Sequence, residues 1–130
     1  AALKLKVTVE RYFSDYKKIF IMGVFKDKEY EKIVQILCPS AKRVYTVDLP
    51  NKERTLPAEK LAECVRDCMT EQMSVYAEKS IGDAVAKAYT YATEDSGKRA
   101  VIACGSLSYL NEVIRCMEGC VQNPQRKERI

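Results

Sequence analysis

Short, unbroken runs of apolar residues, each bounded by charged or polar residues, recur along the chain. Runs of four to seven apolar residues are typical of β-strands that are buried on both faces, as in a parallel sheet. The longest begins at Ile19 and ends at Phe25. The pattern therefore predicts strands at residues 19–25, 44–47, 73–76 and 100–104.

Between these runs, apolar residues recur three and four positions apart, which is the spacing of one face of an α-helix. Pro57 stands where the first turn of a helix tolerates proline. Ser80 and Asp83 resemble a capping box, which marks a helix start. The predicted helices follow stripes at residues 30–37, 61–68, 81–89 and 107–117.

The opening segment fits two structures. Residues 3–10 alternate between apolar and polar side chains, as a half-buried strand does. However, Leu5, Val9, Tyr12 and Tyr16 also share one helical face. The alternation by itself favours a strand.

Strands that alternate with helices indicate an α/β fold, with a mainly parallel sheet and helices on both faces. Because crossover connections are right-handed, the first three strands follow one another across the sheet in one direction. If the fourth strand returns to lie beside the first, the strand order is 3-2-1-4. Ligands of such sheets bind at the carboxyl ends of the strands, beside this switch point. Two loops are expected to meet there, residues 24–28 and 105–108. The loop with Asn51 and Arg54 is interpreted as a polar turn.

These two loops carry the candidate binding residues. Gly105 and Ser106 follow a strand and open a helix, where free amides and a hydroxyl favour an anion. A serine that only caps the helix is the alternative. In the other loop, Lys28 could pair with an anionic ligand, and Asp27 could orient it or bind an ammonium group. The alternative there is an acidic residue near a helix start, flanked by solvated lysines.

Composition excludes several classes of function. The 130 residues are 47% hydrophobic and 31% charged with a net charge of +4, which fits one globular domain and gives no basic stripe for nucleic acid. No apolar run reaches the roughly 20 residues of a membrane span. The chain has no histidine and no phosphate-binding loop motif, so we expect no catalytic residue in it.

Six cysteines raise the question of a metal site or disulfides. Cys64 and Cys68 lie four residues apart, as do Cys116 and Cys120, so each pair shares a helical face. The C-x-x-C spacing of zinc knuckles is absent. We therefore expect buried, reduced thiols and no metal site.

Three segments together resemble the folylpolyglutamate synthase family. The first, Ile21 to Glu29, resembles a strand and loop in which a glycine precedes Asp-Lys-Asp/Glu. The second, Val47 to Ala62, resembles the next strand, loop and helix start. The third, Val101 to Val113, resembles the final Gly-Ser-Leu segment. They follow the family's order and spacing over essentially the whole chain.

The resemblance extends to the Mur ligase superfamily and implies a three-layer Rossmann-like domain with one antiparallel strand. These ligases use ATP and Mg²⁺ to phosphorylate a carboxylate, which the amine of an amino acid then attacks. Residues 1–130 would be a single C-terminal domain without the N-terminal ATPase domain, and inactive alone. In the intact enzyme, this domain would serve the addition of L-glutamate to tetrahydrofolate.

The resemblance also implies roles for individual residues. Ser106, with Gly105, would bind the carboxylate of the incoming glutamate, and Asp27 and Lys28 would line the same cleft. Residues 1–14 would form a helix, and the fourth strand would be an exposed sheet edge.

Other functions fit the same sequence. The intact protein could be a bifunctional dihydrofolate synthase or another Mur-type amino-acid ligase, or the chain could be a non-catalytic Rossmann-like metabolite-binding module. The start at Ala1, without an initiator methionine, indicates a processed or engineered fragment. We expect a cytoplasmic protein of folate and one-carbon metabolism that binds neither nucleic acid nor membrane.

Overall fold

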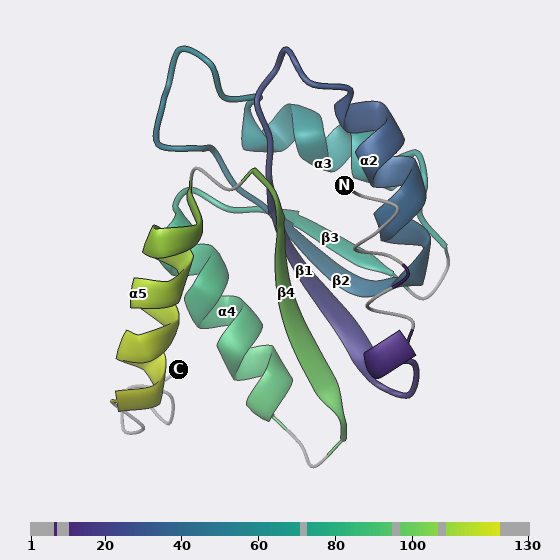
Figure 1. Ribbon diagram of the computed structural model, residues 1–130, viewed down its shortest axis with the longest axis vertical. Helices are drawn as coiled ribbons and strands as arrows, with labels where there is room; N and C mark the ends of the chain where they lie inside the picture. The colour runs from purple at the N-terminus through teal and green to yellow at the C-terminus, as the bar shows by residue number, and fades with distance from the viewer. Residues whose placement is uncertain (1–6, 8–10, 71–72, 95–96, 107–108, 123–130) are drawn as a thin grey trace.

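A four-stranded sheet lies between two layers of helices (Figure 1). The computed structural model describes residues 7, 11–70, 73–94, 97–106 and 109–122. The strands are β1 (Lys17–Gly23), β2 (Ala41–Thr46), β3 (Ser74–Ala77) and β4 (Arg99–Gly105). The helices are α2 (Tyr30–Leu37), α3 (Ala58–Arg66), α4 (Ile81–Thr93) and α5 (Leu110–Gln122), with a short 3-10 helix η1 (Cys38–Ser40) after α2. The predicted three-layer α/β fold is confirmed.

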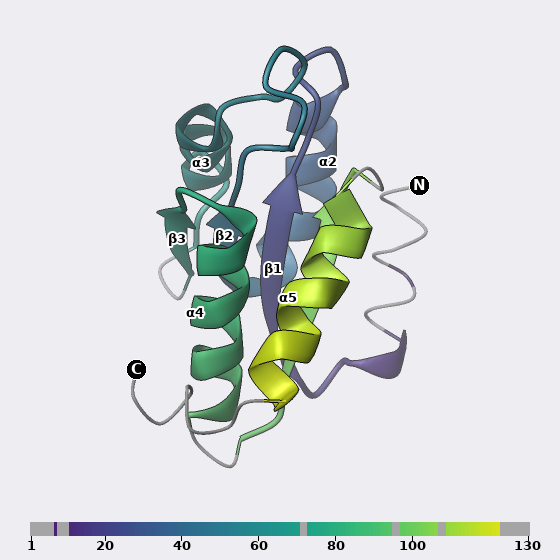
Figure 2. The same cartoon turned by 90° about the vertical axis from the view of Figure 1, so that its left-hand side faces the viewer.

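The strands are parallel and lie in the order β3-β2-β1-β4, as predicted. Helices α4 and α5 cover one face of the sheet, and α2 and α3 cover the other (Figure 2). The antiparallel strand that the resemblance implied is not among the strands of the described residues. The first and fourth strands are neighbours, so the switch point lies between β1 and β4.

The central position of β1 explains its unbroken apolar run. Ile19 and Ile21 pack against the core under α4 and α5, whereas Phe20 and Met22 pack against the core under α2 and α3. In contrast, Val101 in β4 is only half-buried. β4 is therefore an edge of the described sheet, as expected.

The opening segment is helical at its described residues up to Tyr12, but Phe13 and Ser14, which the expected helix included, form a bend and a turn. Val7, Arg11 and Tyr12 are helical, so the strand favoured by the alternation is wrong at Val7. A helix satisfies its backbone hydrogen bonds within the segment, whereas a strand needs a neighbouring chain. The other residues of the expected helix up to residue 10 lie outside the described residues. The amide of Tyr16 bonds to the carbonyl of Phe13 at 3.0 Å, which forms the turn into β1.

All six cysteines are free thiols. Cys38, Cys104 and Cys120 are buried, as expected, whereas Cys64, Cys68 and Cys116 are only half-buried. Burial raises the pKa of the Cys38 thiol to about 12, so this side chain stays neutral and behaves as a small apolar group. The described part of the chain contains no cluster of three side chains suited to a metal ion. Among the same residues, no helix combines the length and apolarity needed to cross a membrane.

Candidate functional site

The two predicted loops meet at the carboxyl ends of β1 and β4. Gly23 and Gly105 are register partners in the parallel pairing. Gly105 has a φ of 106°, and a Cβ atom on it would lie 2.2 Å from the carbonyl oxygen of Gly23 and 3.0 Å from Cγ1 of Val24. Only glycine allows this backbone conformation together with this close approach. The chain therefore enters the Ser106 segment directly against the end of β1.

A buried tyrosine lies beneath this junction. The side chain of Tyr109 is 1% exposed, and its hydroxyl contacts the carbonyl oxygens of Ile21, at 2.9 Å, and Cys104. Burial raises the pKa of Tyr109, so the phenol keeps the proton that it donates. This side chain ties the start of α5 to both β1 and β4. This role was not predicted from the sequence, although a tyrosine four residues before the core residue Val113 is a usable signal.

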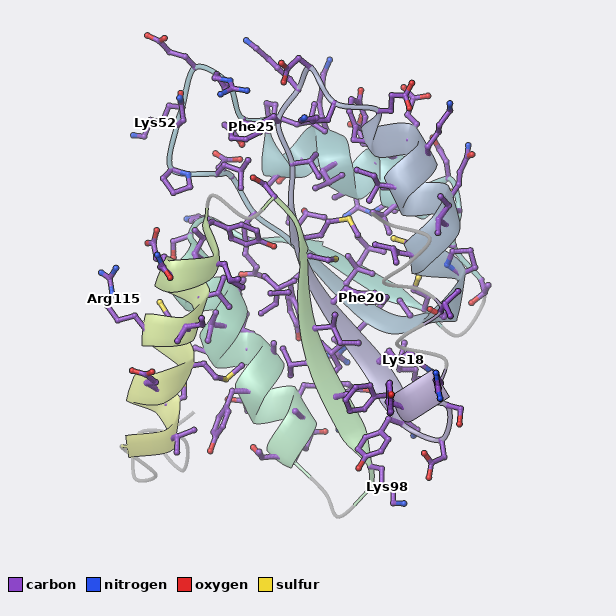
Figure 3. All side chains as sticks on the ribbon, viewed as in Figure 1. Lys18, Phe20, Phe25, Lys52, Lys98 and Arg115 are labelled. Atoms are coloured by element: carbon purple, nitrogen blue, oxygen red, sulfur yellow. The ribbon has the colours of Figure 1, made fainter. Side chains whose placement is uncertain are left out.

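The loop after β2 supports the loop after β1. The amide of Lys26 bonds to the carbonyl of Arg54 at 2.9 Å, and the amide of Leu56 bonds to the carbonyl of Val24 at 2.9 Å. The Arg54 guanidinium carbon lies 4.2 Å from the centre of the Phe25 ring. Figure 3 shows Phe25 on these loops, at the end of the molecule opposite Lys98.

The loop after β2 is a polar turn, as interpreted from the sequence, but it also contributes a residue to the candidate site. The side-chain oxygen of Asn51 accepts bonds from the amides of Glu53, at 3.1 Å, and Arg54, at 3.2 Å, which fixes the turn. Arg54 then forms an ion pair with Asp27, at 3.8 Å between nitrogen and oxygen. Arg54 is thus a residue of the candidate site that the sequence analysis did not include.

Asp48 fixes the other end of this loop. Its Oδ1 accepts a hydrogen bond of 2.7 Å from the amide of Ala58, in the first turn of α3. A carboxylate there caps the helix and opposes the positive end of its dipole. The cap comes from ten residues upstream, so a search for a capping residue next to the helix misses it.

We expect Asp48→Ala to lower the free energy of unfolding by about 1 kcal/mol, because the amide of Ala58 loses its acceptor. Urea denaturation measures this change. Asp48→Asn keeps a side-chain oxygen at the same place and is the matched control, expected within about 0.5 kcal/mol of the unchanged chain. Equal losses in both variants would contradict a capping role.

The structure places the four predicted site residues on two adjoining loops. Gly105 is the turn itself, and Ser106 follows it, half-buried. Asp27 and Lys28 are exposed on the loop after β1, where the amide of Lys28 closes a turn on the carbonyl of Phe25 at 3.2 Å. Leu107 and Ser108, at the end of the second predicted loop, lie outside the described residues.

The charge of the rim that these two loops form at the end of the sheet favours anions. Lys26 and Lys28 remain as cations on the loop after β1, because the charges of Asp27 and Arg54 cancel in their ion pair and Glu29 pairs with Lys32. A rim with more cations than free carboxylates attracts an anionic ligand. The roles of the four predicted residues in binding remain predictions.

Comparison with known proteins gives evidence on the fold that does not depend on the residues of the candidate site. No protein-family model and no curated protein matches the chain. Solved structures do match. A Mycobacterium tuberculosis folylpolyglutamate synthase complexed with ADP superposes with a TM-score of 0.75 at 18% identity, covering 88% of this chain and 27% of that chain. The chain has the fold of a folylpolyglutamate synthase domain.

Two further structures give the same result. E. coli FolC in complex with DHPP and ADP has a TM-score of 0.72 at 18% identity, covering 91% of this chain and 26% of that chain. A bifunctional folylpolyglutamate synthase/dihydrofolate synthase from Yersinia pestis, complexed with AMPPNP and Mn ion, has a TM-score of 0.70 at 20% identity. This match covers 90% of this chain and 26% of that chain. The chain therefore spans about a quarter of the length of these synthases, as expected for their C-terminal domain.

Proposed function

We propose that the chain is the glutamate-side, C-terminal domain of a cytoplasmic, ATP-dependent folylpolyglutamate synthase, which adds L-glutamate to tetrahydrofolate through an acyl phosphate. One observation carries this proposal: the Gly23–Gly105 junction brings Ser106 and a basic loop together at the switch point of a sheet. The fold around that junction is shared with folylpolyglutamate synthases.

The proposed ligase reaction needs an anion-binding site for glutamate in this domain. Glutamate presents carboxylates that must be held while its amine attacks the activated carboxyl group. The hydroxyl of Ser106, at the turn after β4, and the cationic side chains of Lys28 and Arg54 are donors of the required kind. Gly105 lets the backbone turn at this point, so that Ser106 follows directly on the end of β4.

ATP and Mg²⁺ would be held mainly by the N-terminal ATPase domain of the intact enzyme. The described residues of this chain contain no cluster of three side chains suited to a metal ion. All three of the similar structures described above contain ADP or AMPPNP, and one also contains Mn ion, which supports nucleotide use in the intact protein. We expect no ATP turnover by the 130-residue chain alone.

We expect Ser106→Ala in the intact enzyme to raise KM for glutamate about threefold to tenfold, because one hydrogen bond to the carboxylate is lost. KM for ATP should change less than about twofold, since the nucleotide is bound elsewhere. Steady-state kinetics with each substrate varied in turn measure both constants. Ser14→Ala, an exposed serine that precedes β1, is the matched control. An unchanged KM for glutamate would remove Ser106 from the site.

The reaction itself is tested by ATP-dependent phosphate release from the intact enzyme. Release that requires both glutamate and tetrahydrofolate supports the proposal. Release with dihydropteroate and glutamate would favour the second candidate, a bifunctional dihydrofolate synthase, to which the similarity with the bifunctional Y. pestis enzyme also points. Release with neither acceptor would leave another Mur-type ligase or a binding module with this fold.

A further inference from the structure

A cavity of about 360 Å³ opens at the β3 edge of the sheet, on the face covered by α4. Its walls come from β2, from β3 and the residue after it, and from α4 and the residue after it. They comprise Arg43, Tyr45, Tyr76, Glu78, Lys87, Thr90, Tyr91 and Glu94. No residue of the Gly23–Gly105 junction lines it, so this cavity is distinct from the candidate glutamate site.

The strand and helix periods explain why these side chains meet. Arg43 and Tyr45 are two residues apart in β2 and so point to the same face, and Tyr76 is the register partner of Tyr45 in β3. Lys87 and Tyr91 are four residues apart on α4, one turn from each other. Since β3 is an edge of the described sheet, the side chain of Tyr76 remains 41% exposed.

Arg43 is held by aromatic rings. Its guanidinium carbon lies 3.6 Å from the centre of the Tyr91 ring and 5.3 Å from that of Tyr76. Its Nη1 donates a hydrogen bond of 3.1 Å to the Tyr45 hydroxyl. Within the described part of the chain, no carboxylate forms an ion pair with Arg43. Its remaining N–H groups therefore suit an anion with two oxygens.

Two hydroxyl groups add donors to the same cavity. The Thr90 hydroxyl is buried and has no hydrogen-bond partner among the described residues, which is costly for a buried polar group unless a ligand or water satisfies it. The Tyr45 oxygen accepts from Arg43, so its own proton is available for donation. Burial raises the pKa of Tyr45, which keeps that proton in place.

The carboxylates of the cavity limit the charge of a ligand. Glu78, whose side chain is 7% exposed, forms an ion pair of 2.6 Å with Lys87, so these two charges cancel. Glu94 lies at the same cavity and repels further negative charge. A single negative charge is therefore favoured over a doubly charged phosphate.

We propose that this cavity binds a small aromatic carboxylate. The carboxylate pairs with the Arg43 guanidinium and accepts a bond from the Thr90 hydroxyl, and the ring lies against Tyr76. A cavity of about 360 Å³ accommodates a ligand of one or two rings. Phenol rings on its walls provide stacking for the ring of the ligand.

The test is a titration of the ¹⁵N-labelled chain with benzoate, followed by amide chemical shifts. We expect saturable shifts at Tyr76 and Thr90. Cyclohexanecarboxylate keeps the charge without the aromatic ring, benzyl alcohol keeps the ring without the charge, and inorganic phosphate offers a second charge. Cyclohexanecarboxylate is expected to bind about threefold to tenfold more weakly than benzoate, and the other two compounds at least about tenfold more weakly. Absence of saturation by benzoate, or equal binding of cyclohexanecarboxylate, would overturn the proposal.

Variants locate the site. Arg43→Gln should weaken benzoate binding at least about tenfold, and Thr90→Val, which keeps the shape of the side chain, about threefold. Lys42→Gln removes the adjacent positive charge of a residue that does not line the cavity, and should change binding less than about twofold. Thr90→Val keeps the test decisive if Arg43→Gln does not fold. Unchanged affinity in both variants, or shifts confined to Gly105 and Ser106, would place benzoate elsewhere and refute the assignment.

Discussion

Replacement of Gly105 by alanine is expected to lower the free energy of unfolding by about 3–5 kcal/mol. Two costs combine at this residue. A φ of 106° is a conformation that side chains with a Cβ rarely adopt, and the added carbon would lie 2.2 Å from the carbonyl oxygen of Gly23. Since that oxygen belongs to the backbone of the central strand, relief requires a shift of β1 or β4. Urea denaturation with an unchanged m-value measures the loss.

Gly119→Ala is the matched control for this experiment. Gly119 lies inside α5, and a Cβ atom built on it has no neighbour within 4 Å. Alanine there should raise the free energy of unfolding by about 0.5–1 kcal/mol, because it has the higher helix propensity. Changes of the same sign and size at Gly105 and Gly119 would contradict the close approach at the switch point.

The sheet could be predicted because its signals are local or topological. The run from Ile19 is apolar without interruption, and the structure buries it on both faces. The strand order follows from right-handed crossovers with one reversal. Ser80 does cap α4, with its hydroxyl accepting from the amide of Asp83 at 3.1 Å. Each of these signals is carried by neighbouring residues or by general rules of chain direction.

The candidate site was predicted only in part, because its supports join distant residues. Glycine at position 105 signals a turn, but nothing in the sequence shows that its partner is the backbone at Gly23. Arg54 meets Phe25 and Asp27 only because the loops after β1 and β2 run side by side. Such pairings depend on the register of neighbouring strands, which hydrophobic spacing does not specify. The local pattern was misleading in the opening segment, since the alternation of residues 3–10 favours a strand although Leu5, Val9, Tyr12 and Tyr16 also share a helical face.

The second large effect is expected at Tyr109. Tyr109→Ala should lower the free energy of unfolding by about 3–5 kcal/mol, because it removes a fully buried ring from the core under α4 and α5. It also removes the hydroxyl that contacts the carbonyl oxygens of Ile21 and Cys104. Thermal or urea denaturation measures the total loss.

Tyr109→Phe separates the hydroxyl from the ring. The ring remains, while two buried carbonyl oxygens lose a donor, so the expected loss is about 1–2 kcal/mol. Tyr12→Phe, at an exposed tyrosine, should stay within about 0.5 kcal/mol of the unchanged chain. A loss at Tyr109→Phe no larger than that at Tyr12→Phe would show that ring packing alone holds α5 against the strands. The predicted loss would instead mean that one phenol proton helps to hold the carboxyl ends of β1 and β4, and with them Ser106, in place.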